Sequence, residues 1–374
     1  MIDTLKATVP VDASTIAPLH GLFARRAVPT HDPGLTWRCS WHIGANQGRP
    51  YHTYKAECGG LHLMISMSRR QADIGIDSLP KAIYGHNAYL LTPDGCLQAI
   101  HEVDRRMAPF GVPPLIAWQV SEVHFSHDFL VDPRHLDDYF SSFESRQVRQ
   151  RGPRRDVVRH HPGTLTWPLG KYTADIQIYD KYDQLRPALK PLVPEGTLRL
   201  EVRLRSRGLR ALARALGRCR PLTVADALSP WVAYAALVDY MKRLDLDREI
   251  DADGAAERIT AAYRDRDHRD ALLIVYHALC SGASARHVES VLGYRGLKDP
   301  AGALSRYTWE LRDLGAVPGV PGLKLPGLVL PPFEQFSGQS EEPLAPEALS
   351  ACAEPVPEEQ EDVASLSRVL VAVG

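Results

Sequence analysis

Apolar and polar residues alternate repeatedly through the first 205 positions of the chain. A period of two is typical of β-strands with one buried face. Strands are predicted at residues 36–42, 51–57, 61–67, 72–77, 118–125, 163–167, 175–181 and 197–205. Helices are predicted between them at 93–107, behind the candidate cap Thr92, and at 133–143. This pattern predicts an α+β domain built on an antiparallel sheet.

Beyond Arg205 the apolar residues recur at helical spacing. Helices are predicted at residues 208–216, 223–228, 230–244, 255–264 and 270–280. Residues 284–294 and 300–314 resemble a helix pair joined by a glycine-containing turn, which is either a small DNA-reading module or part of an ordinary bundle. We therefore expect an antiparallel-sheet domain at 1–205, a mainly helical C-terminal domain at 206–336 and a disordered acidic tail at 337–374.

The overall charge does not indicate a nucleic-acid-binding protein, because the formal net charge is −1 at pH 7. Regions of opposite sign are averaged in this sum, so the distribution matters more. The six cysteines lack the close spacing of a zinc or redox motif, which fits a reducing cytoplasm best. No apolar run of about 18 residues occurs, so we expect neither secretion nor membrane insertion.

The predicted strand 175–181 places a phenol and an ammonium group on one face, through Tyr179 and Lys181. A free tyrosine has a pKa of about 10, so a nucleophilic tyrosine needs a nearby cation or base. Lys181 could supply that charge or hold a phosphate. The alternative interpretation is an amphipathic strand whose Tyr and Lys are solvated.

The predicted strand 197–205 places the carboxylate of Glu201 among the guanidinium groups of Arg199, Arg203 and Arg205. One interpretation is a surface ladder of ion pairs, which contributes little stability. The other makes Glu201 a metal ligand and lets the neighbouring arginines bind DNA phosphate.

Residues 121–129, if extended, place four polar side chains on one face, namely Glu122, His124, Ser126 and Asp128. Imidazole and carboxylate together can bind Mg²⁺ or Mn²⁺, which would polarise phosphoryl oxygens. Taken singly, such histidines are more often hydrogen-bonded residues of a strand than metal ligands.

A cluster of arginines follows within fourteen residues, comprising Arg146, Arg149, Arg151, Arg154, Arg155 and Arg159. Such a run would neutralise several DNA phosphates and make binding salt-dependent. Gly152 and Pro153 mark an exposed loop, so these side chains could instead be merely solvated.

The order of these motifs resembles the replication initiators of filamentous phages and related plasmids, the gene II/gene X family. Matching segments lie at residues 1–5, 79–87, 121–125, 164–170, 178–181 and 198–204. Residues 178–181 are similar to the Tyr-x-Lys motif of the family, and 198–204 to its Val-Arg-Phe-Glu-Ala-Arg-Ile strand. Each motif is weak alone, but several in the right order are specific, and the resemblance spans roughly residues 1–210.

The resemblance implies a rolling-circle replication initiator that nicks and rejoins single-stranded DNA. Tyr179 would attack the origin of a phage or plasmid and leave a 5′-phosphotyrosyl link and a free 3′-hydroxyl, with Lys181 beside it. The host helicase and DNA polymerase would supply unwinding and synthesis in the bacterial cytoplasm, and Mg²⁺ or Mn²⁺ would be the cofactor. The predicted DNA-binding residues are the six clustered arginines, Arg199 and Arg203.

Two positions depart from the pattern of the family. Glu122-x-His124 replaces its Arg-x-Asp, and Gln184 stands where an acidic residue is expected, preceded by Asp183. The expected metal ligands are therefore His124, Asp128 and Glu201.

Two further hypotheses belong to other classes of protein. One is a non-catalytic protein that binds the origin or single-stranded DNA, which the altered acidic positions suggest. The other is a phosphodiesterase that uses metal-activated water. No glycine-rich phosphate loop occurs, so we do not expect ATP hydrolysis.

Overall fold

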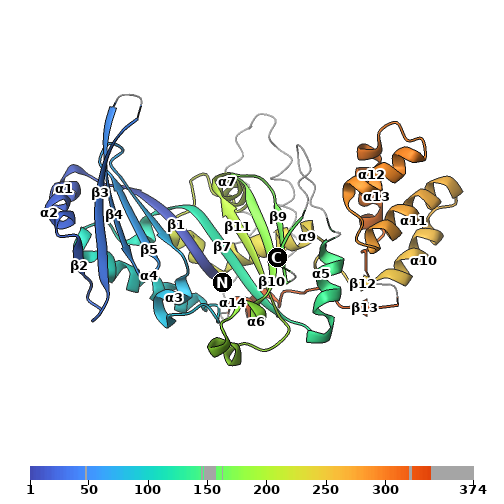
Figure 1. The fold of residues 1–374 in the computed structure, drawn as a ribbon, viewed down its shortest axis with the longest axis horizontal. Helices are drawn as coiled ribbons and strands as arrows, with labels where there is room; N and C mark the ends of the chain where they lie inside the picture. Colours follow the sequence, from blue (N-terminus) through green and yellow to red (C-terminus); the bar gives the residue numbers. More distant parts are fainter. Residues whose placement is uncertain (47–48, 145, 147–156, 162, 320–321, 338–374) are drawn as a thin grey trace.

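The computed structural model describes residues 1–46, 49–144, 146, 157–161, 163–319 and 322–337 of the 374-residue chain. Figure 1 shows a long curved sheet with helices packed along it and a further group of helices at one end. Apart from Ser337, the predicted acidic tail lies outside the described residues. Within the described part of the chain, no helix is both long and apolar enough to span a membrane.

Eleven strands of the described chain form one sheet in which all neighbouring strands are antiparallel. Their spatial order is β2 (Ala27–Pro29), β3 (Thr36–Asn46), β4 (Arg49–Cys58), β5 (Leu61–Ser66), β6 (Gln71–Ile76), β1 (Ile2–Pro10), β7 (Gln119–Leu130), β11 (Thr197–Arg205), β10 (Ala174–Asp180), β9 (Thr164–Pro168) and β8 (Val158–His161). The α+β fold with a large antiparallel sheet is thus confirmed.

The alternation of residues did not predict β1, although this strand lies in the middle of the sheet. Its pairing with β7 shifts register between Ile2 and Leu5. Ile2 and Asp3 are consecutive and both buried, so the period of two is interrupted at this point.

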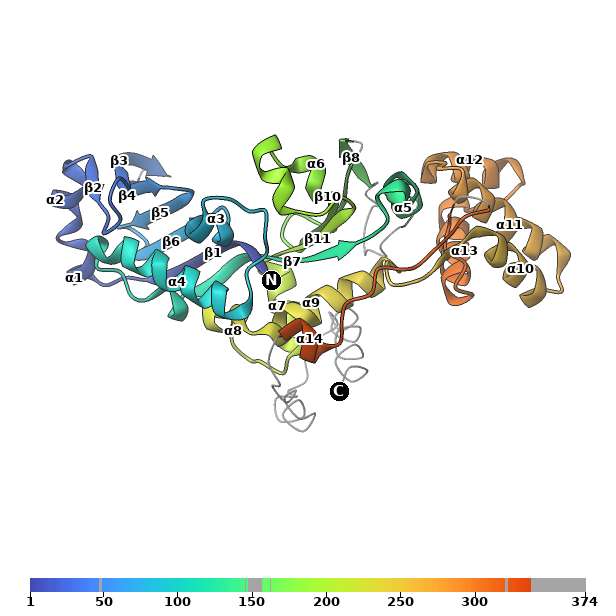
Figure 2. The same ribbon diagram turned by 90° about the horizontal axis from the view of Figure 1, so that it is seen from below.

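One face of the sheet is apolar and covered by helices, while the other is polar. Ile176 and Ile178 of β10 and Leu200 of β11 are fully buried in the apolar core. Helices α7, α8 and α9 contact β7 from this side, and α14 packs on α9. Figure 2 shows α9 and α14 on the side opposite to α6 and β8. These helices therefore do not cover the polar face of β7, β10 and β11.

The helices are short or medium in length. They are α1 (Ala13–Ile16), α2 (Leu19–Ala24), α3 (Leu79–Tyr84), α4 (Pro93–Met107), α5 (Leu136–Glu144), α6 (Lys181–Gln184), α7 (Ser206–Ala215), α8 (Val224–Leu228), α9 (Pro230–Arg243), α10 (Ala252–Ala262), α11 (Arg266–Cys280), α12 (Ala285–Tyr294), α13 (Pro300–Asp313) and α14 (Phe333–Ser337). A two-stranded sheet of β12 (Ile250–Asp251) and β13 (Lys324–Leu325) joins the chain on either side of α10–α13.

The hydrophobic residues form two large cores. The first contains the sheet together with α7, α8 and α9. Leu325, Leu328 and Phe333, which follow α13 in the chain, also belong to it. The second belongs to α10–α13. The predicted boundary at residue 205 therefore falls inside a shared core, because the apolar face of the sheet is covered by helices that follow it in sequence.

Candidate functional site

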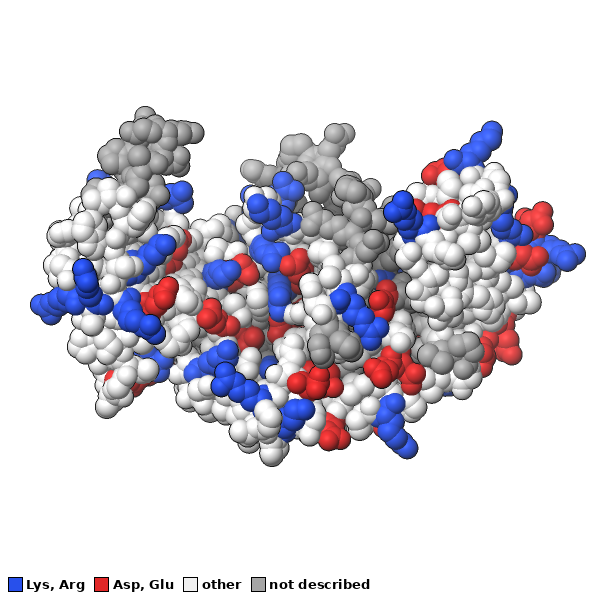
Figure 3. Space-filling model, in the orientation of Figure 1, with Lys and Arg blue, Asp and Glu red and all other residues white. Residues whose placement is uncertain are grey.

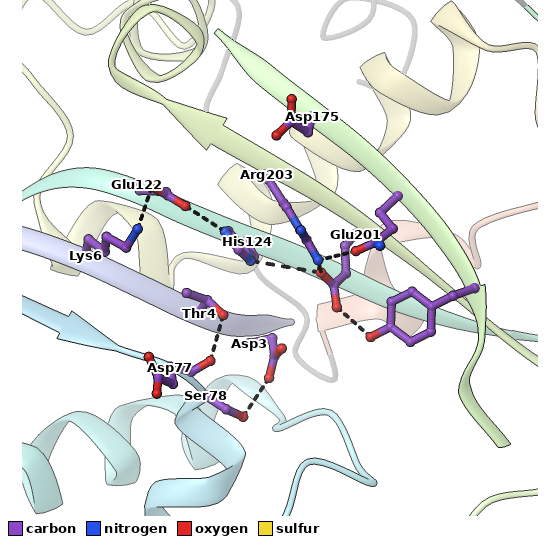
Figure 4. A network of polar contacts seen from close by, with 12 residues as sticks. Asp3, Thr4, Lys6, Asp77, Ser78, Glu122, His124, Asp175, Glu201 and Arg203 are labelled. Atoms are coloured by element: carbon purple, nitrogen blue, oxygen red, sulfur yellow. Dashed lines mark hydrogen bonds and ion pairs between the residues drawn. The ribbon is translucent and has the colours of Figure 1, made fainter. Parts of the chain in front are cut away.

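The polar face of β10, β11 and β7 carries the predicted catalytic and metal-binding residues in neighbouring rows across the strands. The rows cross from β10 through β11 to β7 as Tyr179, Arg199 and Asp128; Gln177, Glu201 and Ser126; and Asp175, Arg203 and His124. Side chains of facing residues lie on the same side of a sheet, with Cβ atoms about 5 Å apart. Figure 4 shows Glu201, Arg203, His124 and Glu122 side by side on these strands.

Tyr179 and Glu201 form the centre of this arrangement. The phenol of Tyr179 donates a hydrogen bond of 2.5 Å to Glu201 Oε1, and only 3% of Tyr179 is exposed. Burial, together with the charge of Glu201, raises the pKa of Tyr179 well above its ordinary value. Burial opposes ionisation of Glu201, but Arg203 and the hydrogen bond from Tyr179 hold its pKa below the usual value. The resting pair is therefore a neutral phenol beside a carboxylate.

Lys181 lies beside this pair, though not on the strand that was predicted to carry it. β10 ends at Asp180, whose carboxylate caps α6 by accepting from the Asp183 N–H at 3.1 Å. The Lys181 Nζ lies 5.9 Å from the centre of the Tyr179 ring. Burial, reinforced by the charge of Arg199, lowers the pKa of Lys181 to about 8. This ammonium group can therefore give up a proton near neutral pH.

The two arginines of β11 have different surroundings. Arg203 donates to Glu201 Oε2 at 2.8 and 3.1 Å and also to Gln177, and its side chain is 30% exposed. Arg199 is fully buried. It donates to both oxygens of Asp128 at 2.6 and 2.7 Å and to the backbone carbonyls of residues 87 and 88 at 3.1 Å. Of the two predicted DNA-binding arginines on this strand, only Arg203 has a surface that a phosphate can reach.

We expect Asp128→Ala to destabilise the fold by about 3 kcal/mol, because it leaves the buried Arg199 guanidinium without its counter-charge. The lower end of the range for buried pairs applies since the Asp128 side chain is 29% exposed. The urea midpoint, followed by tryptophan fluorescence, measures this loss. Asp137→Ala, an exposed position on α5, is the matched control and should change stability by less than about 0.5 kcal/mol. Equal midpoints for the two variants would contradict the structural role of Asp128.

The side chains of the three predicted metal ligands, His124, Asp128 and Glu201, do not meet at one point in this structure. His124 Nδ1 is 4.0 Å from Glu201 Oε2, but both Asp128 oxygens accept hydrogen bonds from Arg199. His124 Nε2 also contacts Glu122 at 3.0 Å. Asp128 therefore does not fit the expected shell, whereas His124 and Glu201 lie together.

Among the described residues, three ligand atoms converge elsewhere, at His31, Asp32 and Glu102. Both of these carboxylates pair with Arg106, at 2.9 and 2.8 Å. The group is thus accounted for as an ion-pair network in which the arginine already supplies the positive charge.

Two further residues lie near Glu201: Asp3, which the sequence reasoning missed, and Ser126, which it placed on the polar face without a role. Asp3, on β1, is buried, and burial together with the charge of Glu201 raises its pKa. It accepts a hydrogen bond of 2.7 Å from Ser78 (Figure 4). Ser126 faces Glu201, and its buried hydroxyl has no hydrogen-bond partner among the described residues. Asp3 lies within the matched segment 1–5, which was the available signal.

The arginine cluster is described only at its two ends. Arg149, Arg151, Arg154 and Arg155 lie outside the described residues. Arg146 is buried and donates to the backbone carbonyls of residues 244 and 245, and burial lowers its pKa to about 9. Arg159 pairs with Glu144 at 2.9 Å. Arg146 is thus a buried cation held by backbone carbonyls rather than a surface residue.

The charges on this face are mixed in sign. Figure 3 shows Lys and Arg interspersed with Asp and Glu over its middle, rather than one continuous basic patch.

No family model matches the chain, and a search of curated proteins found no significant match. The functional argument therefore depends on the geometry of the Tyr179 site.

Proposed function

We propose that this protein nicks and rejoins single-stranded DNA through Tyr179, as an initiator of rolling-circle replication at a phage or plasmid origin. The observation that carries the proposal is the hydrogen bond from the Tyr179 phenol to Glu201, with Lys181 and Arg203 beside it. Nucleophile, base and cations are the parts that transfer of a phosphodiester to tyrosine requires. The ordered resemblance of the sequence motifs supports the same function.

The chemistry can be written with the residues of this chain. The Tyr179 oxygen attacks the backbone phosphorus and forms a new P–O bond while the bond to the 3′-oxygen breaks. Glu201 accepts the phenol proton as attack proceeds, so a free phenolate is not required. Lys181 gives a proton to the departing 3′-oxygen, and Arg203 offsets negative charge on the phosphate. The reverse steps rejoin the strand.

Access to Tyr179 is a further requirement of this mechanism. The residue is 3% exposed, so a phosphate can reach its oxygen only after the groups that cover it move. Arg199 ties the backbone at residues 87 and 88 to this row through two hydrogen bonds. Displacement of this segment is one route by which a DNA strand could enter.

A non-catalytic DNA-binding protein is the second candidate function. The burial of Tyr179 and its raised pKa favour this alternative, because both oppose nucleophilic attack in the resting state. Salt-sensitive binding would then remain without any covalent step.

A covalent adduct separates the two candidates. The full chain is incubated with Mg²⁺ or Mn²⁺ and a 5′- or 3′-labelled single strand that spans the origin of its own replicon. The proposal expects a denaturation-resistant adduct on the 3′-labelled strand alone, and mass spectrometry of the attached peptide should identify Tyr179. Binding without an adduct would support the non-catalytic alternative. An adduct on another residue would overturn the assignment of Tyr179.

The rate should fall as the pH rises above about 8, because Lys181, whose pKa is about 8, loses the proton needed by the leaving oxygen. Glu201 has a lowered pKa and stays ionised across this range, so the acid limb lies below neutral pH. Adduct formation at subsaturating DNA reports the groups of the free protein. The basic limb should disappear in Lys181→Met, which lowers the rate at all pH values. An unchanged basic limb in this variant would exclude Lys181 as the acid.

A further inference from the structure

The helices α11, α12 and α13 form a compact unit at one end of the molecule. Each of the three contacts the other two, and α10 packs on α11. Val288 and Leu292 of α12 pack with Leu304 and Leu311 of α13 in a core separate from that of the sheet. A five-residue turn with Gly296 at φ +83° joins α12 to α13. The arrangement is a three-helix unit whose last two helices form a helix–turn–helix pair.

Both helices of this pair carry exposed residues on their outward faces. On α12, Arg286, Ser290 and Tyr294 recur at helical spacing and are exposed; Tyr294 is 90% exposed. The first two turns of α13 present Ala301, Gly302, Ser305 and Arg306 at the surface or close to it. Small residues at the start of a helix allow its backbone to approach a partner closely.

The exposed charges on these faces are mainly positive. Arg286, Arg295, Lys298 and Arg306 are all exposed. Two of the neighbouring acidic residues make contacts of their own, and a third is partly buried. Asp299 caps α13 by accepting from Gly302 N–H at 3.0 Å, Glu310 contacts His268 at 2.5 Å, and Glu289 is partly buried. Asp313 lies at the opposite end of α13 from the turn.

We propose that α12, the turn and the first two turns of α13 form a second binding surface, for duplex DNA. A helix whose first turns present small residues and the cation Arg306 fits the major groove, while Arg286, Arg295 and Lys298 beside it contact the phosphates. This surface goes beyond the proposed nicking function, which concerns a single strand at Tyr179. Figure 2 shows α12 on the same side of the molecule as α6 and β8, away from α9 and α14. A duplex at α12 and α13 and a single strand at Tyr179 could therefore bind on the same side of the molecule.

The experiment compares the full-length protein with Lys298→Ala/Arg306→Ala by fluorescence anisotropy. The probe is a labelled duplex of about three helical turns and mixed sequence. Loss of two phosphate-binding cations should weaken binding roughly tenfold at low salt and make the log–log salt dependence shallower by about two. Arg264→Ala, an exposed cation in the loop between α10 and α11, is the matched control and should bind like the unmodified protein. All three substituted residues are at the surface, and thermal melting verifies the fold of each variant.

A duplex affinity within twofold of the unmodified protein would overturn the proposal, as would an equal loss in Arg264→Ala. Adduct formation on a single-stranded oligonucleotide should be unchanged in Lys298→Ala/Arg306→Ala, because neither residue is near Tyr179. If no adduct forms with any protein while the duplex defect persists, the nicking function fails and the duplex-binding surface stands. A parallel loss of single-strand binding would instead indicate a general polyanion surface and contradict the assignment to duplex DNA.

Discussion

Tyr179→Phe should abolish the covalent protein–DNA adduct, with a loss of at least about a thousandfold in the rate of adduct formation. The substitution removes only the oxygen that would attack phosphorus, and the ring that fills the buried space remains. The hydrogen bond to Glu201 is lost as well, which leaves a buried carboxylate that still contacts Arg203. The measurement is a single-turnover time course on denaturing gels with a labelled strand.

The matched control is Tyr182→Phe, because Tyr182 is three residues further along and only partly buried. Its hydroxyl interacts with Glu195, which raises its pKa. We expect this variant to form the adduct at nearly the unmodified rate. Loss of the adduct in Tyr182→Phe but not in Tyr179→Phe would transfer the nucleophile to residue 182. Binding of the strand should survive in both variants, which separates chemistry from affinity.

Glu201→Gln should lower the rate of adduct formation by about a hundredfold to ten-thousandfold, the usual contribution of a general base. The amide keeps nearly the same shape but cannot accept the phenol proton as attack proceeds. Glu201 is almost fully buried and contacts both Tyr179 and Arg203. Its removal leaves the guanidinium of Arg203 without its carboxylate, although the 30% exposure of that side chain limits the cost.

A second readout distinguishes a base from a merely structural residue. The negative charge of Glu201 is one cause of the raised pKa of Tyr179, so Glu201→Gln should move that pKa back toward its ordinary value. Ultraviolet difference titration against Tyr179→Phe measures the shift. Glu122→Gln is the control, since Glu122 lies on the same face but contacts Lys6 and His124. A normal rate in Glu201→Gln, or an equal loss in Glu122→Gln, would contradict the role of Glu201 as the base.

Much of the site was accessible from the sequence, because strand alternation is a local property. The period of two in residues 175–181 and 197–205 predicted correctly that Tyr179 and Glu201 lie on polar faces of strands. The α+β fold followed from the same pattern. The predicted strand included Lys181, but β10 ends one residue earlier, at Asp180, because the Asp180 side chain caps α6. Competition between a strand and a helix cap is not visible in the alternation of residues alone.

By itself, then, the sequence determined which residues could share a face, and the tertiary structure decided which of them meet and which remain free. Asp128 was expected as a metal ligand, yet it pairs with Arg199, and Arg146 is buried against backbone carbonyls rather than exposed. Asp3 lies nearly 200 positions before Glu201 but shares its electrostatic environment. The physical reason is that alternation fixes the direction of a side chain from its immediate neighbours, whereas pairing, burial and charge compensation depend on strands far apart in the chain.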